Sequence, residues 1–520
     1  MPAVVFFVSG NGVFMALEEK EKLEKNYAGA PGQGGQGKPG GPVGPGGRGG
    51  KDFLGTEPTG ALLRKFTIPS IVAMLVGSLY NIVDQFFIGQ SVGHLGNAAT
   101  NIAFPLGTLC IATALLCGIG GASAFNISMG RGERDTAVNY MGNAAVMMVG
   151  IGVLMILIVE IFLTPILRFF GSPADVLPYA QEYARITALG FPFLILTSGG
   201  GHLVRADGRP TTSMLCNLSG ALINVVLDWL FVFIFHWGMA GAAAATIIGQ
   251  YISGGLIIWN LAHCRSVKLS ADNLRIRREY AGYILQLGAS PCSNQLAMAV
   301  VQIVMNNSLK YYGARSIYGE SIPIAVSGVI NKVNMIFMSF IIGLSQGSQP
   351  IVSFNYGACK YDRVKRTYRQ AITVGAGIAA FAFLMFQILP RQITQIFGDG
   401  SAEYYRFAVR YFRIFLFFTF LNFLQPLTSN FFTAIGKPRI GIVLSLSRQV
   451  LLLLPMILIM PLIFGIDGIM YAGPVADFTA AFLCFLFVRK EFARPEYRQA
   501  AGEAVNRRDS ESIGVNRRDR

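Results

Sequence analysis

The sequence predicts an all-α polytopic membrane protein. Of its 520 residues, 52 % are hydrophobic and only 14 % are charged, whereas a soluble globular chain carries about 25 % charged residues. Apolar segments of roughly the length that crosses a bilayer as a helix recur along the chain. We expect twelve transmembrane helices, centred near residues 77, 112, 151, 192, 223, 250, 296, 337, 378, 418, 451 and 479.

The second half of the chain repeats the first. Short motifs return at an offset of 227 or 228 residues, among them Phe170-Gly171 as Phe397-Gly398 and Gly208-Arg-Pro210 as Gly436-Lys-Pro438. A nearly constant offset indicates an internal duplication. Six helices per repeat is an even number, so both repeats enter the membrane in the same direction. This predicts two six-helix lobes related by a pseudo-twofold axis along the membrane normal, with a central cavity.

Composition sets the outer boundaries of these lobes. The stretch Gly29–Gly50 is dominated by Gly and Pro, which is typical of a flexible linker. Its match to the dinucleotide fingerprint, Gly32-x-Gly34-x-x-Gly37, lacks the strand and helix that the motif requires. Translation can begin at Met1 or at Met15. We predict a disordered extension (1–60), a first lobe (61–262), a basic linker (263–279), a second lobe (280–490) and a disordered basic tail (491–520).

The net charge of +15 reflects orientation in the membrane rather than a nucleic-acid partner, which we do not expect. Sixteen Lys and Arg residues lie in the connections that follow the even-numbered segments. The opposite connections carry four, which are Arg168, Lys310, Arg315 and Arg391. Because positive charge accumulates on the cytoplasmic side, we predict a multi-pass protein of the plasma (inner) membrane with both termini in the cytoplasm.

The first apolar segment, Ile68–Gly89, contains a single acid, Asp84. Along a helix, Tyr80 and Asn81 lie on the same face as this acid. An ionised carboxylate near the middle of a bilayer costs roughly 2.5–3.5 kcal/mol on insertion scales. An acid retained there is expected to bind or move a charged species, unless it lies near enough to the helix end to reach interfacial water.

The fifth and sixth segments supply partners for this acid. Asn217, Asn224 and Asp228 are spaced seven and four residues apart and form one polar stripe, and Thr246 and Gln250 follow on the next segment. Such residues can be interhelical hydrogen-bonding groups, but two acids favour a cation or proton site. A carboxylate pair titrates as a unit or holds Na⁺ with amide and hydroxyl oxygens, and the residues do not decide between H⁺ and Na⁺. The candidate coupling residues are Asp84, Asn224, Asp228 and Thr246.

The second half does not copy these acids, since Asp228 corresponds to Met456. Its polar candidates are Gln295, Lys332 and Asp477, and we expect a buried pair between Lys332 and Asp477 in a structural or a transport role. Lys332 is expected to be the only basic residue deep in a segment. No P-loop, HExxH or nucleophile elbow occurs in a usable context, and the seven cysteines are scattered. We therefore predict no enzyme, no cofactor and no metal site.

Several longer stretches carry a resemblance to one transporter family. They are LGTEPTGALLRKFTIPSI (54–71), LYNIVDQFFIG (79–89), GHLVRADGRP (201–210), NVVLD (224–228), GAAAATIIGQ (241–250) and GLSQGSQPIVSFNYGA (343–358). Over about residues 54–490 the chain resembles the multidrug and toxic compound extrusion (MATE) family, particularly its MepA-type bacterial branch. The resemblance implies twelve helices in two lobes and efflux of amphipathic organic cations in exchange for H⁺ or Na⁺. Asp84, Asn224, Asp228 and Thr246 match the first-lobe coupling pattern of that family, whereas second-lobe acids that another branch uses are missing.

Three functions compete at this point. The favoured hypothesis is a monomeric, cation-coupled multidrug efflux antiporter that works by alternating access in the lipid bilayer. A flippase for lipid-linked saccharides has a related architecture but needs a strongly basic cavity, which Lys332 alone does not provide. A membrane scaffold or channel would use the acids only for folding.

Overall fold

The computed structural model describes residues 52–92, 94–319, 321–397 and 401–497. These ranges are helical with short connections. The side chains of several helical positions, Asn81 among them, also lie outside the described set. The Gly/Pro-rich stretch Gly29–Gly50 and most of the predicted basic tail fall outside it as well.

The first half of the chain forms the helices up to residue 262. They are α2 (Asp52–Thr56), α3 (Thr59–Val92), α4 (His94–Arg131), α5 (Arg134–Phe169), α6 (Leu177–Ala188), α7 (Phe191–Ile195), α8 (Gly201–Ala206), α9 (Pro210–Asp228) and α10 (Gly238–Ala262). Two π-helical stretches interrupt them, η1 (Leu196–Gly200) and η2 (Trp229–Ile234). A single 3₁₀ turn, η3 (Ala271–Leu274), lies in the connection to the second half.

The second half forms the remaining helices. They are α11 (Arg278–Gly313), α12 (Ser321–Gly357), α13 (Tyr361–Ile388), α14 (Pro390–Ile396), α15 (Ala402–Phe415), α16 (Thr419–Asn422), α17 (Leu424–Ala434), α18 (Pro438–Leu446), α19 (Leu454–Phe464) and α20 (Ile466–Phe492). A third π-helical stretch, η4 (Ser447–Leu453), joins α18 to α19.

The multi-span helical fold class is confirmed. Nine helices of the described residues are long and apolar enough to cross a membrane, and two bent pairs raise that number to as many as eleven. All eleven coincide with predicted segments. The remaining segment, centred near residue 296, is α11, which is long enough but carries many amides, such as Gln295 and Asn306, and falls short in hydropathy.

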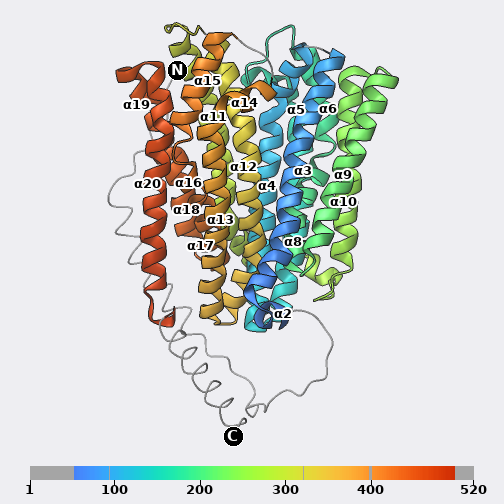
Figure 1. Cartoon of the computed structure of the whole chain (residues 1–520). Coiled ribbons are helices and arrows are strands. Elements are labelled where there is room, and N and C mark those ends of the chain that lie inside the picture. The colour runs from blue at the N-terminus through green and yellow to red at the C-terminus, as the bar shows by residue number, and fades with distance from the viewer. Residues whose placement is uncertain (1–51, 93, 320, 398–400, 498–520) are drawn as a thin grey trace, which may run out of the picture. The chain divides into compact units, whose positions relative to one another are not determined.

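The helices run side by side in one bundle, with α9 and α10 at one edge and α19 and α20 at the other (Figure 1). The two halves meet where α4 packs along α11 and α3 along α12. Glycines make these contacts close: a Cβ on Gly288 would lie 1.8 Å from the Leu116 carbonyl oxygen. Small residues at such crossings let two helix backbones touch.

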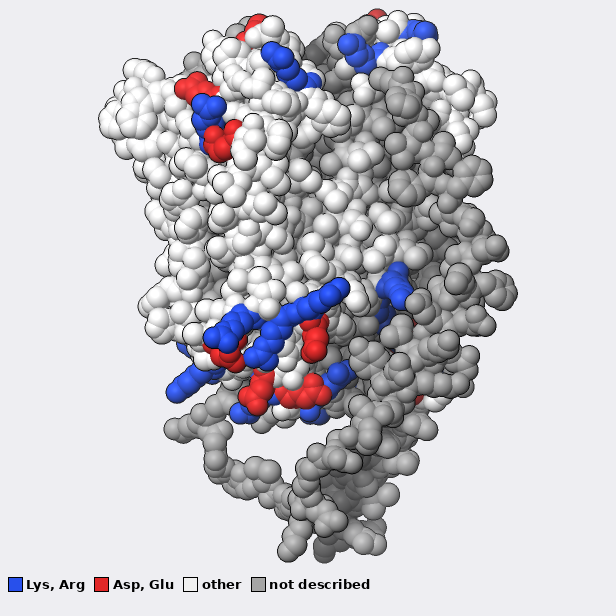
Figure 2. All heavy atoms as spheres, turned by 180° about the vertical axis from the view of Figure 1, so that it is seen from behind, with Lys and Arg blue, Asp and Glu red and all other residues white. Residues whose placement is uncertain are grey.

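We call the end of the bundle where α2 lies the α2 end, and polar contacts tie the seam between the halves near the middle of α3 and α12 and closer to this end. The hydroxyls of Ser78 and Ser339 are 2.6 Å apart, and Gln349 donates to Ser123 at 2.7 Å. On the face drawn in Figure 2, charged side chains gather toward the two ends of the bundle and leave an uncharged belt between them. This belt is where lipid tails are expected to contact the protein.

The packed chain extends beyond two predicted boundaries. α2 and the start of α3 precede residue 60, and the side chain of Leu54 is fully buried. After residue 490, Glu491 and Tyr497 are buried as well. Composition could not reveal this, because a few anchoring side chains are enough to hold a terminal segment against the bundle. The division into two lobes stays a prediction.

Candidate functional site

The two acids of the first half lie together inside the bundle. Asp84 on α3 is 9 % exposed, and Asp228, the last residue of α9, is fully buried. Their carboxyl groups lie close enough to interact electrostatically, but neither oxygen of Asp228 has a hydrogen-bond partner among the described residues. Phe87, one turn after Asp84, packs edge-to-face on Phe233 of η2. This ring contact holds α3 against η2, the π-helical stretch that continues α9. The structure therefore places the acids of the first and fifth predicted segments, on α3 and α9, beside each other, and their role as a coupling pair stays a prediction.

Asn224 and Thr246 complete the predicted group. Asn224 lies one turn before Asp228 and interacts with that carboxyl group. Its side-chain Nδ2 donates to Thr246 Oγ1 on α10 at 3.4 Å, and its Oδ1 has no partner at ordinary hydrogen-bond geometry. Because Gly220 and Gly249 bring the backbones of α9 and α10 into contact, these short side chains can meet.

Two tyrosines line the same group of residues. Tyr80 on α3 and Tyr183 on α6 both lie close to Thr246 and to the two acids. Sequence reasoning proposed Tyr80 but missed Tyr183. The axes of α6 and of the segment that follows it differ by 63°, and this bend, which periodicity does not reveal, decides which face of α6 meets α10.

The other polar candidates of the first half serve different contacts. Asn217 donates to the Ser213 carbonyl of its own helix at 3.1 Å. The Gln250 side chain lies against Gly190, at the break between α6 and α7. Asn81 lies outside the described side chains. The polar stripe predicted along the fifth segment, which is α9, is therefore divided: Asn224 and Asp228 lie at the acid site, and Asn217 bonds within its own helix.

The second half contains a neutralised acid instead. The expected pair between Lys332 and Asp477 is wrong: Arg448 Nε donates to Asp477 Oδ1 at 2.6 Å. Asp477 is 2 % and Arg448 13 % exposed by side chain. Lys332 is exposed and makes no ion pair with any described residue. Arg448 lies in η4, so Lys332 is also not the only basic residue deep in a segment.

Comparisons with known proteins point to one family. The sequence profile of the MatE family matches residues 69–230 and 294–459. This chain belongs to the MatE family. Its members are transporters rather than enzymes, and the predicted family is confirmed. The two stretches matched in this MatE chain are separated by nearly the same offset as the repeated motifs, which is independent support for the duplication.

Curated relatives and solved structures align with most of this MatE chain. The multidrug export protein MepA of Staphylococcus haemolyticus is 23 % identical over 81 % of this chain and 92 % of its own. MepA of Staphylococcus aureus strain N315 is 22 % identical over 83 % and 94 %. A solved outward-facing multidrug resistance MATE transporter has a TM-score of 0.79 at 22 % identity and covers 85 % of this chain and 97 % of its own.

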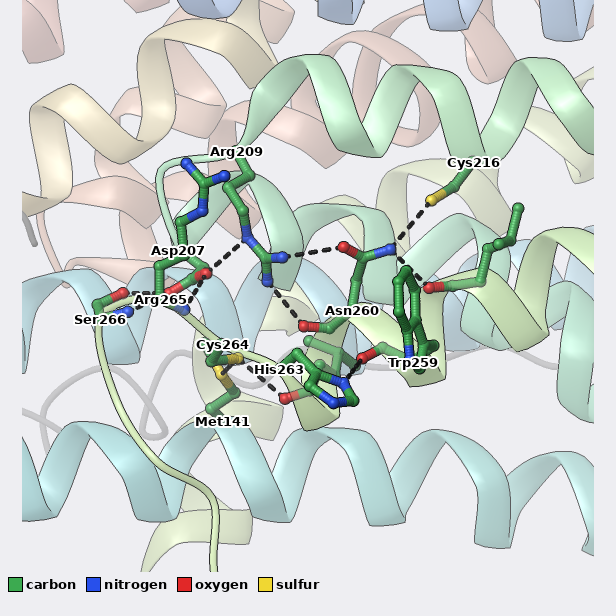
Figure 3. Close-up of polar contacts among 12 residues, drawn as sticks. Met141, Asp207, Arg209, Cys216, Trp259, Asn260, His263, Cys264, Arg265 and Ser266 are labelled. Carbon is green, nitrogen blue, oxygen red and sulfur yellow. Dashed lines mark hydrogen bonds and ion pairs between the residues drawn. The ribbon is translucent and has the colours of Figure 1, made fainter.

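The motif GHLVRADGRP of this MatE chain builds a polar network at the α2 end (Figure 3). Asp207 accepts hydrogen bonds from Arg209 Nε at 2.8 Å and from the backbone N–H groups of Arg265 and Ser266. Arg209 also reaches Asn260 Oδ1 at 2.9 Å. The network therefore fixes the turn between α8 and α9 to the end of α10 and to the following connection.

One basic residue of that motif is not in a connection. Arg205 on α8 is 3 % exposed and was counted among the orienting charges. It donates to Ser213 Oγ at 3.0 Å and, across the seam, to Gln346 Oε1 on α12 at 3.2 Å. Excluding it leaves the bias toward the α2 end intact, since one residue of sixteen changes place.

Proposed function

We propose that this chain is a cation-coupled multidrug efflux antiporter, acting as a monomer, that exports amphipathic organic cations by alternating access. The MatE profile and the MepA relatives support a transport function. The observation that carries the coupling is the pair of buried carboxyl groups, Asp84 and Asp228, which lie near each other with no basic partner among the described side chains.

This arrangement requires a positive charge from outside the protein. Holding an ionised carboxylate in the apolar layer costs roughly 2.5–3.5 kcal/mol on insertion scales, and two facing each other cost more. A proton shared between the acids, or a Na⁺ ion held by carboxylate, amide and hydroxyl oxygens, removes that charge. Asn224 Oδ1 and Thr246 Oγ1 are the oxygens beside the pair. H⁺ and Na⁺ remain alternatives.

Exchange follows if ion and drug favour different states of the protein. A cationic drug is attracted to the outward-facing or inward-facing cavity while the acids are charged, and loading of the ion removes that attraction. A ligand shifts a conformational equilibrium only by its difference in affinity for the two states. The effect is reciprocal, so each species promotes release of the other.

The α2 end is proposed to face the cytoplasm. Most basic residues of the connections lie there, for example Arg131 and Arg363, and positive charge accumulates on that side of a membrane. Cys264, next to Arg265 in the connection between the halves, tests the orientation. We expect an impermeant thiol reagent to leave Cys264 unlabelled in intact cells and to label it in inverted vesicles.

The main test replaces each acid with its amide. Asp84→Asn and Asp228→Asn keep the shape of the side chain but cannot exchange charge, so gradient-driven ethidium efflux should fall at least tenfold per folded transporter. Glu160→Gln is the matched control, because Glu160 lies in the same half in a partly exposed pair with Arg185. Normal efflux per molecule in either amide variant would remove that acid from the mechanism. Imposing a proton or a sodium gradient on proteoliposomes then identifies the ion.

The same assay separates the alternatives. A flippase would give no gradient-dependent ethidium movement, and the structure disfavours it because Arg448 is already neutralised by Asp477. A scaffold would show reduced protein level in the amide variants with unchanged movement of drug. A channel would conduct ions without accumulating drug against a gradient.

A further inference from the structure

The short helix α2 has backbone carbonyls that its own turns cannot satisfy. In an α-helix the carbonyl of Leu54 would bond the N–H of Pro58, which proline lacks. The carbonyls of Gly55 and Glu57 also lie at the helix end, where no intrahelical donor follows. The carbonyls of Leu54, Gly55 and Glu57 are thus available to accept hydrogen bonds from outside α2, directly before α3.

Among the described residues, side chains of the second half donate to all three of these carbonyls. Asn355 Nδ2 and Arg363 Nη2 bond the Leu54 oxygen at 2.9 and 3.1 Å. Arg363 Nη2 also bonds the Glu57 oxygen at 2.6 Å, and Lys360 Nζ bonds the Gly55 oxygen at 2.9 Å. The donors lie at the end of α12 and the start of α13. Cationic donors at a helix C-terminus also interact favourably with its dipole.

The donor group is itself ordered. Arg363 Nε donates to Asn355 Oδ1 at 2.9 Å, which directs the Asn355 amide toward Leu54. A guanidinium offers several N–H groups in fixed directions, whereas a lysine offers only one point charge at this site. We call the contacts of Asn355, Lys360 and Arg363 with residues 54–57 the clamp. Arg363 makes two of these contacts and also orients the Asn355 amide.

The other side of α2 is attached to the first half. Phe53 stacks with Phe66 of α3 at a centroid distance of 6.4 Å, and Lys65 lies 4.7 Å over its ring. The same ring lies 3.1 Å from the position of a Cβ on Gly208, in the turn between α8 and α9. α2 thus connects the two halves across the α2 end.

The segment that precedes α11 in the chain is held in the corresponding way by side chains of the first half. Asn143 on α5 donates to the Arg275 carbonyl at 3.2 Å and accepts from the Arg277 N–H at 2.8 Å. Asn139 accepts from Asn273 Nδ2 at 3.0 Å. The segment before each repeat is therefore held by the opposite half, by amides in one case and by cations in the other.

We propose that α2 is a strap that holds the α2 end closed and is released from Arg363 and Lys360 each time that end opens. The proposal rests on alternating access as the proposed function. α3 and α12 separate at this end when it opens, so the clamp between α2 and α12–α13 must break. Losing it shifts the population toward the state that is open at the α2 end.

The test measures opening of the seam directly. Thr67 is 5 % exposed on α3 and faces Gly347 of α12, so a Thr67→Cys thiol is shielded while the seam is closed. Maleimide labelling of this thiol is followed by peptide mass spectrometry in the purified, detergent-solubilised full-length protein. Native Cys359, which is exposed, is the reference for reagent activity.

Four further variants carry the same probe. Deleting residues 1–57, which removes α2, and Arg363→Ala should each raise the labelling rate at position 67 at least tenfold. Arg363→Lys, which keeps the charge, should lie between Arg363→Ala and the unmodified chain. Deleting residues 1–50, which leaves α2 in place, should change nothing.

The outcomes separate the strap from simple stabilisation. Equal labelling in all variants, with or without a lower Tm, would overturn the strap. If the longer deletion fails to fold, Arg363→Ala and Arg363→Lys still decide. The labelling needs neither a gradient nor a defined orientation, so it can support the strap even if the efflux assay contradicts the transport proposal, and the reverse also holds.

Discussion

The two halves of the bundle treat a buried acid in opposite ways. In the first half, Asp84 and Asp228 face each other with only amide and hydroxyl groups beside them. In the second half, Asp477 is bonded at 2.6 Å to Arg448. Under the proposed function, an external cation balances the acids of the first half, whereas Arg448 balances the acid of the second half from within the protein. The proposal therefore assigns the response to an ion gradient to the first half alone.

The largest effect on stability is expected from breaking the internal pair. Arg448→Met leaves Asp477 buried and uncompensated, which costs about 3–5 kcal/mol when one partner of a buried pair is removed. The double variant Arg448→Met/Asp477→Leu should recover most of this loss. Unfolding in detergent, followed by Tm, measures both, and equal destabilisation of the single and double variants would contradict the neutralised-pair interpretation.

Replacing an acid of the first half should have the opposite pattern of effects, with little change in stability and a large loss of coupled efflux. Asp228→Asn removes a buried charge without leaving a cation unpaired, so its unfolding free energy should change by less than about 1 kcal/mol, while coupled efflux is lost. A Tm loss as large as that of Arg448→Met would show that Asp228 is needed mainly for folding.

A smaller effect is expected at the hydroxyl between the acids and the tyrosines. Thr246→Val keeps the branched shape but removes the oxygen that accepts from Asn224. We expect coupled efflux to fall several-fold, and Thr246→Ser should restore it because the hydroxyl returns. Equal activity of the valine and serine variants would exclude the hydroxyl from ion binding.

Tyr183→Phe should have a milder effect, because the ring that fills the space remains and only its hydroxyl contact with Thr246 is lost. Efflux is expected to fall about two- to threefold, with a shift in the ion concentration that gives half-maximal transport. An unchanged ion dependence would place Tyr183 outside the coupling site.

The smallest effect is expected for Lys332→Gln. Lys332 is exposed and has no ion pair in the described part of the chain, so stability and ethidium efflux should remain within about twofold of the unmodified protein. A large loss of efflux with unchanged Tm would instead assign Lys332 to the transport path.

Sequence reasoning found the parts of the site that follow from spacing along one helix. Asn224 and Asp228 lie one turn apart, and an acid inside an apolar segment marks Asp84 without further information. The contacts of Tyr183 and Arg448 depend on other features. A 63° bend after α6 orients Tyr183, and the π-helical winding of η4 sets the direction of the Arg448 side chain. Neither the bend nor the wider winding leaves a regular period in the sequence.

The contact between Gly288 and the Leu116 carbonyl has a mechanical consequence. With no side chain between the two backbones, α11 can turn against α4 at this point but cannot move closer or slide without a collision. From Gly288 to Gly313 the helix forms an arm about 38 Å long at 1.5 Å per residue, with Pro291 in its first turn. A rotation of about 10° at this fulcrum moves the far end of the arm by roughly 6 Å. A displacement of that size exceeds the diameter of a dehydrated cation, although the atoms at the fulcrum hardly move.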